Sequence, residues 1–383
     1  MIGRIFVARA LRSFADGFIS VVLPAYLLAL GLGELEVGII STATLLGSAG
    51  MTLAVGRWGH RFPIRRLMLG AALLMAATGL AFAGAASFWP LLLVAFFGTL
   101  NPSSGDASVF MPLDHTMLAT AADRTSVFAR YSFIGSMAGA CGALITGLPE
   151  WLGADLRLMF VLYAAAGVAV WLLYLGLPEA RAEEHRPPAP LGPSKGIVVR
   201  LAALFSVDAF AGGLVVNSLM TLWLFERFGL SLAQAGLFFF WAGLLSAFSQ
   251  LMAPVVARRI GLLNTMVFTH IPANAFLIFA ALAPNLPLAL GLLLARAALS
   301  QMDVPTRTAF VMAVVTPAER AAAASVTAVP RSLAAAASPT LAGALLATGM
   351  LSLPLVLCGA MKIAYDLSLL VCFRRLKPPA ESK

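Results

Sequence analysis

The chain is a succession of long apolar segments separated by short polar ones. Twelve apolar segments of about 20 residues can be marked, and this is the length that an α-helix needs to cross a bilayer. The apolar runs are continuous and do not alternate with polar residues, so they favour helices over the strands of a β-barrel. The expected spans are 5–31, 36–56, 67–86, 90–118, 125–148, 157–177, 198–225, 232–256, 264–283, 288–315, 321–347 and 351–373. The pattern predicts an all-α membrane protein with twelve transmembrane helices.

Composition agrees with this pattern. Of the 383 residues, 60% are hydrophobic and 11% are charged, and the mean hydropathy is +0.92. Soluble globular chains are about 45–50% apolar and about 25% charged. The first apolar run continues past the length of a signal peptide and lacks a small-residue cleavage site, so we interpret it as the first span. We expect a multi-pass protein of a bacterial inner membrane, in contact with the lipid bilayer.

Positive charge lies in alternate loops. The formal net charge is +9, and Lys and Arg gather at the two termini and in one set of short loops, whereas the opposite loops hold little beyond Arg157 and Arg227. The positive-inside rule then places both termini in the cytoplasm. A segment rich in Pro and charge, 178–196, predicts a cytoplasmic linker between an N-terminal six-helix bundle (1–177) and a C-terminal one (197–383). Positive charge in alternate loops sets the orientation of a membrane protein, so it does not indicate a nucleic-acid partner, and we expect none.

The two halves repeat at a nearly constant offset. Pro90 and Pro287 are 197 positions apart, and so are Asp106 and Asp303. The sequences AADR and PAER, which end at Arg124 and at residue 320, are offset by 196. Two parallel six-helix repeats are typical of a secondary transporter.

The loop between the second and third expected spans carries a family resemblance. Its sequence is GRWGHRFPIRR, residues 56–66. It resembles the signature loop of the major facilitator superfamily, with Gly56, Arg61, Arg65 and Arg66 in register. His60 stands where that family has an acidic residue, and a proline replaces the second glycine of the motif.

The resemblance extends over essentially the whole chain, because twelve spans, a central linker and a half-length repeat accompany the loop. It implies two pseudo-symmetric six-helix bundles around a central cavity, lined mainly by helices one, four, seven and ten. It also implies alternating access and a monomer. The family's acid helps to close the cytoplasmic gate, and His60 cannot supply that negative charge. We therefore expect Asp123, next to Arg124 in a neighbouring cytoplasmic loop, to substitute for it.

Several ionisable residues fall at bilayer depth. Each costs at least ~2.5–3.5 kcal/mol there, so each is expected to face protein or water and is a functional candidate. A buried carboxylate without a neighbouring cation can take up a proton near neutral pH. Asp106 has no Arg within a helical turn and leads the candidates for proton coupling, although a structural pair with Arg130 is an alternative. The other proton-coupling candidates are Asp16, Asp208 and Asp303.

The tenth span concentrates charge on one side. At 100° per residue, Arg296, Asp303 and Arg307 lie within about 40° of one stripe. Such a ladder is either a salt-bridge lock or a source of cationic charge for an anionic group. Pro305 should bend this helix. The candidates for substrate binding are Arg296, Arg307, Ser300, Asn101, Asn217 and Arg331.

Other charges receive structural interpretations. Arg9 and Arg12 lie near the cytoplasmic end of the first span, where snorkelling to the interface would explain them. Lys362 and Asp366 are spaced i,i+4 in the last span and are interpreted as a pair on a peripheral helix.

These observations predict a secondary active transporter, and not an enzyme. No phosphate-binding GxxxxGK loop occurs and no nucleophile–base set is visible, so no cofactor, catalytic residue or transition-metal site is expected. The prediction is proton-coupled efflux of a small organic solute, supported by short loops and a resemblance to exporters. The alternatives are uptake of a metabolite whose anionic group binds Arg296 or Arg307, a metal-ion exporter that uses carboxylates as ligands, and a non-transporting receptor.

Overall fold

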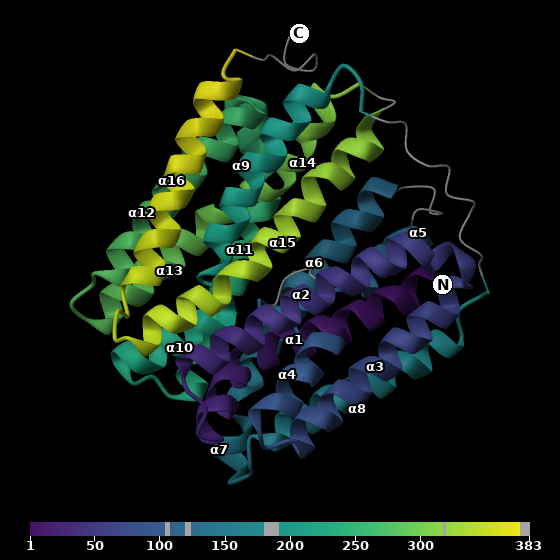
Figure 1. Ribbon diagram of the computed structural model, residues 1–383, viewed down its shortest axis with the longest axis vertical. Coiled ribbons are helices and arrows are strands. Elements are labelled where there is room, and N and C mark those ends of the chain that lie inside the picture. Colours follow the sequence, from purple (N-terminus) through teal and green to yellow (C-terminus); the bar gives the residue numbers. More distant parts are fainter. Residues whose placement is uncertain (104–107, 119–123, 180–190, 317–318, 376–383) are drawn as a thin grey trace. The chain divides into compact units, whose positions relative to one another are not determined.

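The computed structural model describes residues 1–103, 108–118, 124–179, 191–316 and 319–375, and this part of the chain is helical without strands (Figure 1). The helices of the first half are α1 (Ile2–Ala29), α2 (Glu34–Trp58), α3 (Ile64–Gly84), α4 (Phe88–Phe97), α5 (Phe110–Leu118), α6 (Arg124–Leu144), α7 (Leu148–Leu152) and α8 (Arg157–Leu175), with 3-10 turns at Gly59–Arg61 and Ile145–Gly147. Those of the second half are α9 (Lys195–Gly213), α10 (Asn217–Phe228), α11 (Leu232–Ile260), α12 (Leu262–Ala281), α13 (Leu286–Ser300), α14 (Asp303–Val314), α15 (Arg320–Ala347) and α16 (Leu353–Phe373).

Nine helical segments in the described part of the chain are long and apolar enough to cross a membrane. The nine do not include α1 or α15, and both of these helices carry charge in mid-helix. Their bounds, Ile2–Ala29 and Arg320–Ala347, nevertheless match the first and eleventh expected spans. The all-helical membrane architecture is confirmed, and the count of twelve spans stays a prediction.

Three expected spans are broken helices. The fourth is divided between α4, which ends at Phe97, and α5, which begins at Phe110. The seventh is split into α9 and α10 around 214–216, and the tenth into α13 and α14 around 301–302. Proline accounts for the last break, because Pro305 cannot donate a backbone hydrogen bond to the carbonyl of Gln301. The bend predicted for the tenth span is therefore confirmed. Broken helices are tolerated in membranes where protein or a water-filled cavity satisfies the freed backbone groups.

The chain divides into two compact units. The first unit comprises Met1–His185, Val216–Gly243 and Pro339–Thr348. The second comprises Arg186–Val215, Leu244–Ser338 and Gly349–Lys383. The expected division into bundles at 177 and 197 remains a prediction, and the units show that α10, the start of α11 and the end of α15 pack with helices of the first half.

Small residues bring helices of the first unit into close contact. A Cβ atom added at Gly17 would lie 2.0 Å from the carbonyl oxygen of Gly139, so α1 and α6 touch through their backbones. Gly38 of α2 likewise faces Gly343 at the end of α15, where an added Cβ would lie 3.0 Å from the Gly343 Cα atom. Such contacts are typical of membrane helices, whose association depends on close packing.

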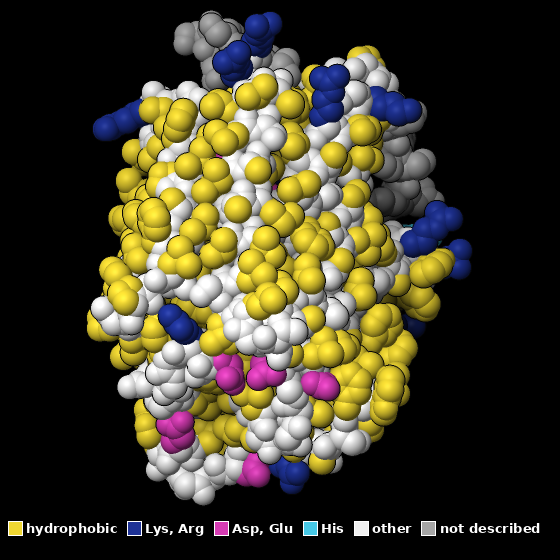
Figure 2. Space-filling model, turned by 60° about the vertical axis from the view of Figure 1, so that its left-hand side comes forward, with side chains coloured by type: hydrophobic (Ala, Val, Ile, Leu, Met, Phe, Trp, Pro, Cys, Tyr) yellow, Lys and Arg dark blue, Asp and Glu magenta, His cyan; other side chains and the backbone are white. Residues whose placement is uncertain are grey.

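The second unit is built around long helices that pack side by side. Helix α12 lies against α13 and α16 (Figure 1), and α16 also packs on α9. Phe205, Phe310 and Phe373, from α9, α14 and α16, lie in its buried apolar core. Hydrophobic side chains cover much of the surface drawn in Figure 2. Apolar side chains on the outside of long helices suit contact with lipid.

Candidate functional site

A buried ion pair lies inside the first unit. Asp114 of α5 is completely buried, and its carboxylate pairs with the Arg12 guanidinium of α1. The Tyr131 hydroxyl donates a hydrogen bond to the same carboxylate over 2.7 Å, and the Tyr174 hydroxyl approaches it at 3.5 Å. Arg12 also donates to the Tyr174 oxygen and lies 4.2 Å from the ring centre of Phe110. The charges of Arg12 and Asp114 are thus balanced and enclosed, as a stable buried pair requires.

The snorkelling interpretation of Arg9 and Arg12 is wrong. Only 7% of Arg9 and 3% of Arg12 are accessible, so neither side chain reaches an interface. Arg9 lies over the ring of Tyr131, 4.8 Å from its centre. Gly135 leaves room for it, because a Cβ atom there would lie 2.4 Å from Arg9 Nε. The aromatic and carboxylate partners come from helices distant in sequence, so position along α1 alone could not reveal them.

A second polar cluster, in the second unit, shares its ions among several partners. Asp208 of α9 accepts hydrogen bonds from Lys362 Nζ at 2.5 Å and from Arg307 Nη1 at 3.1 Å. The same Arg307 atom lies 3.0 Å from the carboxylate of Asp303, one turn earlier on α14. We call these four residues the shared-ion network. It holds two acids and two bases, and one guanidinium nitrogen bridges the two acids.

The network confirms part of the predicted ladder on the tenth span. Asp303 and Arg307 pair as expected, but Arg296 lies on α13, beyond the helix break, where it interacts electrostatically with Cys358. The stripe expected for one straight helix therefore stops at the break. Arg296 Nε is buried and has no hydrogen-bond partner among the described residues. Ser300, the last residue of α13, is buried.

The predicted pair of Lys362 and Asp366 is wrong. Lys362 turns to Asp208, while the Asp366 carboxylate lies 3.0 Å from Nδ1 of His270 on α12. Both residues of α16 are buried, so this helix contributes charged side chains to the buried polar cluster of the second unit. The i,i+4 spacing allowed the pair, but partners on α9 and α12 satisfy the charges instead.

Arg331 has a different environment from the other cations of the second unit. It lies on α15, its side chain is exposed, and it interacts electrostatically with Arg307, Asp208 and Asp303. Within the described part of the chain it has neither a hydrogen bond nor an ion pair. Its neighbours in the shared-ion network are already balanced, so Arg331 adds an uncompensated positive charge beside them.

The breaks in the fourth and seventh spans meet in the first unit. The Pro102 carbonyl accepts a hydrogen bond from the backbone N–H of Ser218 over 3.0 Å. Asn101 is buried, and its side chain accepts from the backbone and hydroxyl of Ser103. Asn217 begins α10 and is half-buried. The backbone on either side of the two breaks is thus joined by this hydrogen bond.

Other predicted site residues have simpler positions. Asp16 is half-buried on α1 and interacts electrostatically with Tyr163. Arg130, the proposed partner of Asp106, is exposed on α6. Asp106 and Asp123, and with them the proposed gate contact of Asp123, lie outside the described residues, as does the side chain of Arg124.

The loop 56–66, which carries the family resemblance, has most of its charged side chains on the surface. His60, Arg61 and Arg66 are exposed, and Gly56 is exposed near the end of α2. Arg65 donates to the carbonyl oxygen of Leu175, at the end of α8. A cation at a helix C-terminus interacts favourably with the helix dipole. This contact ties the loop to the end of α8.

One carboxylate outside the membrane-spanning segments is strongly perturbed. Glu319, just before α15, accepts hydrogen bonds from the hydroxyls of Ser194 and Thr316, each over 2.6 Å, and from the backbone N–H of Gly192. These bonds favour the charged form and lower the pKa of Glu319 to about 2. In the sequence, Glu319 stands out only as part of the repeated PAER segment, and its partners Ser194 and Gly192 precede α9. Glu319 thus fastens the entry of α9 to the α14–α15 loop.

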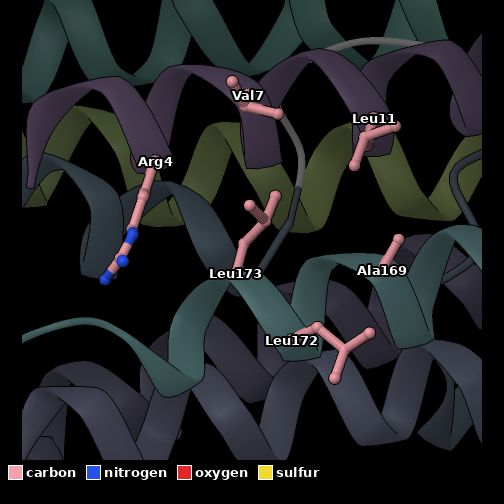
Figure 3. A pocket seen from close by; sticks show the side chains of 6 residues that line it. All are labelled: Arg4, Val7, Leu11, Ala169, Leu172 and Leu173. Carbon is pink, nitrogen blue, oxygen red and sulfur yellow. The ribbon is translucent and has the colours of Figure 1, made fainter.

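The described cavities do not contain the charged clusters. A groove of about 380 Å3 in the first unit is lined by Arg4 and by five apolar residues of α1 and α8 (Figure 3). Arg4 donates to the carbonyl oxygen of Gly176. A second hollow, of about 500 Å3, is lined by residues of α1, the α7 region and the α10–α11 turn, including Glu150. Neither hollow contains a predicted binding residue.

A family model and a protein relative both match most of this chain. A family model described as Major Facilitator Superfamily matches residues 5–329. An uncharacterized membrane protein of Saccharomyces cerevisiae is 26% identical over 414 residues, covering 95% of this chain and 92% of the relative.

Solved structures of transporters share the fold. The nucleoside transporter NupG superposes with a TM-score of 0.76 at 14% identity, covering 98% of this chain and 99% of that chain. A bacterial homologue of the iron transporter ferroportin gives 0.73 at 16% identity, covering 97% and 98%. A bacterial homologue of the lysosomal transporter Spinster gives 0.70 at 17% identity, covering 97% and 94%.

Proposed function

Because the chain belongs to the Major Facilitator Superfamily and has the fold of secondary transporters, we propose that it moves a small organic solute by alternating access, coupled to protons through Asp303. The observation that carries the proposal is the position of Arg307 Nη1, which lies 3.1 Å from Asp208 and 3.0 Å from Asp303. One cation therefore serves two acids.

A shared cation allows one acid to exchange its proton without stranding a buried charge. Asp208 has a second cation, Lys362, whereas Asp303 has only Arg307 among the described ion pairs. When Asp303 takes up a proton, Arg307 keeps Asp208 as its counterion. The network then carries one excess positive charge, but neither Arg307 nor Lys362 is left without an anionic partner, because both contact Asp208. Asp303 is thus the better proton carrier of the two.

The broken helices support a transport role for the same region. Asp303 is the first residue of α14, directly after the break in the tenth span. A helix begins there with free backbone N–H groups and a positive dipole end, which favour the charged carboxylate. A break also lets α13 and α14 change their relative angle. Motion at the break would alter the distance between Asp303 and its partners, and so link protonation to conformation.

The metal-exporter alternative finds little support. The carboxylate of Asp208 is occupied by two cations, and Asp303 by one. The described residues contain no group of three or more His, Cys, Asp and Glu side chains placed to hold a metal ion. Hard cations need several free oxygen ligands. An organic solute is the better match to this site.

We propose export as the direction and the cytoplasm as the location of both termini, on the sequence arguments of short loops and positive charge. The bacterial inner membrane stays a prediction. Asp106 also stays a proton-coupling candidate on sequence grounds.

The test begins with growth of an efflux-deficient host on a broad panel of toxic compounds. Cells would carry the wild type, Asp303→Asn, Asp106→Asn or an empty vector. Wild-type resistance to a compound class that Asp303→Asn loses at equal protein level would support proton-coupled export. Hypersensitivity of the wild type would instead identify uptake. Full resistance in Asp303→Asn would reject Asp303 as the coupling residue.

A further inference from the structure

The most unusual cation of the second unit is Arg331. Helix α15 has 28 residues, and Arg331 is the twelfth. At a rise of about 1.5 Å per residue, it lies about 17 Å from one end of the helix and about 24 Å from the other. A guanidinium at this depth costs several kcal/mol if it faces lipid, so it must face water, a polar cavity or a counterion.

The part of the chain that the structure describes provides no counterion for it. The described residues offer Arg331 no ion pair, and its electrostatic neighbours include the like-charged Arg307. The two nearby acids, Asp208 and Asp303, are balanced by Arg307 and Lys362. Arg331 is exposed, whereas these four residues are buried, so it is the charge of this region that a solute can reach.

We infer that Arg331 binds an anionic group of the transported solute, a carboxylate or a phosphate, and that the substrate class is therefore small organic anions. The guanidinium fork matches both groups with two parallel hydrogen bonds. This inference rests on the proposed transport function and names its substrate class. The sequence suggested Arg307 as an anion-binding residue, but Arg307 is already paired with Asp208 and Asp303. The inference assigns that role to Arg331, which has no ion pair among the described residues.

The geometry also explains how an anion would affect the shared-ion network. Arg331 interacts electrostatically with Asp208, Asp303 and Arg307 at once. A bound anion would neutralise Arg331 and so change the electrostatic environment of Asp303, which links solute binding to the protonation state of that carboxylate.

The first experiment measures accessibility and protection of Arg331 in the full chain in nanodiscs. Phenylglyoxal modifies accessible guanidinium groups, and peptide mass spectrometry gives the rate at each arginine. The probes are acetate, succinate, citrate, benzoate and glycerol 3-phosphate, each beside its amide or alcohol at constant ionic strength. Arg227, exposed at the end of α10, is the matched control.

We expect at least one acid at millimolar concentration to slow modification of Arg331 severalfold, with no effect at Arg227 and none from the neutral analogue. The carboxylates and the phosphate ester form separate arms, so the result also identifies the preferred anion. If no acid protects Arg331 more than its neutral analogue does, or if Arg331 is not modified at all, the inference is overturned.

A second measurement separates this inference from the proposed function. The protecting acid should raise the thermal unfolding midpoint of the wild type, to a smaller degree that of Arg331→Lys, and not that of Arg331→Gln. A shift that survives in Arg331→Gln would refute the binding role. If a neutral solute drives proton flux that Asp303→Asn loses and Arg331→Gln keeps, proton-coupled transport stands and the anionic substrate class falls.

Discussion

The two buried clusters contain the same kinds of charge but differ in how those charges are shared. In the first unit, Asp114 has one cation and two tyrosine hydroxyls around it, and the set is closed. In the second unit, Arg307 serves two acids and Asp208 has two cations. A closed pair can only be broken, whereas a shared ion can exchange partners. In the proposed function, the first cluster therefore holds helices together and the second carries the proton chemistry.

The largest effect should come from breaking the closed pair. Asp114→Asn leaves the buried Arg12 without its counterion, which should cost about 3–5 kcal/mol of unfolding free energy. Denaturant unfolding of the purified protein, or loss of monodisperse protein on size-exclusion chromatography, measures this.

The matched control removes both charges of that pair. Replacing Arg12 by Met and Asp114 by Leu together should cost less than Asp114→Asn alone, since hydrophobic replacement of a buried pair is often nearly neutral. The pairing would be contradicted if the double variant lost as much unfolding free energy as Arg12→Met and Asp114→Leu lose separately when their two losses are added.

A smaller loss of stability is expected in the shared-ion network. Asp303→Asn removes one acid, but Arg307 retains Asp208, so we expect a cost of up to about 3 kcal/mol. The same unfolding measurement applies. A cost equal to that of Asp114→Asn would show that the two clusters are alike, and would remove the basis of the comparison.

A smaller effect again should follow from deleting one tyrosine hydroxyl. Tyr131→Phe removes a 2.7 Å hydrogen bond to Asp114 but leaves Arg12 in place. We expect a loss of about 1.5 kcal/mol and unchanged transport. Altered proton coupling in this variant would show that the first cluster also takes part in the proton chemistry.

The smallest effect concerns pH and lies outside the membrane spans. The pKa of Glu319 is lowered from 4.5 to about 2 by its hydrogen bonds. Its contribution to stability is therefore present above about pH 4.5 and is lost as the pH falls toward 2. Glu319→Gln should be less stable than the wild type at pH 6, and the difference should shrink as the pH falls from 4.5 to 2.5. A difference independent of pH would contradict the role of its charged form.

The sequence predicted the elements well where local pattern decides them. The ends of α2, α8 and α12 lie within a few residues of the expected spans, because each is a continuous apolar run. Pro305 also indicated where the tenth span bends. Asp303, Arg307 and Asp208 were expected to face protein or water, and all three are buried in the protein, as the cost of an ionisable residue at that depth requires; their role in transport stays a prediction.

Pairing between distant residues was not predictable from the same pattern. Lys362 reaches Asp208 across 154 positions, and Arg12 reaches Asp114 across 102. Spacing along one helix suggested Asp366 and the membrane interface as their partners, and both interpretations were wrong. The tyrosines around Asp114 carry no charge, so nothing in the sequence marked them. Helix packing decides which charge meets which, and one sequence does not contain that information.

The most direct test of the central claim is the number of protons moved per solute in proteoliposomes. Solute uptake and internal pH would be followed together for the wild type, Asp303→Asn and the Arg12→Met/Asp114→Leu double variant, with a solute identified by the growth panel. The account predicts that Asp303→Asn still exchanges solute but moves no protons with it, whereas the double variant keeps the wild-type ratio. A wild-type ratio in Asp303→Asn, or a ratio lost only in the double variant, would contradict it.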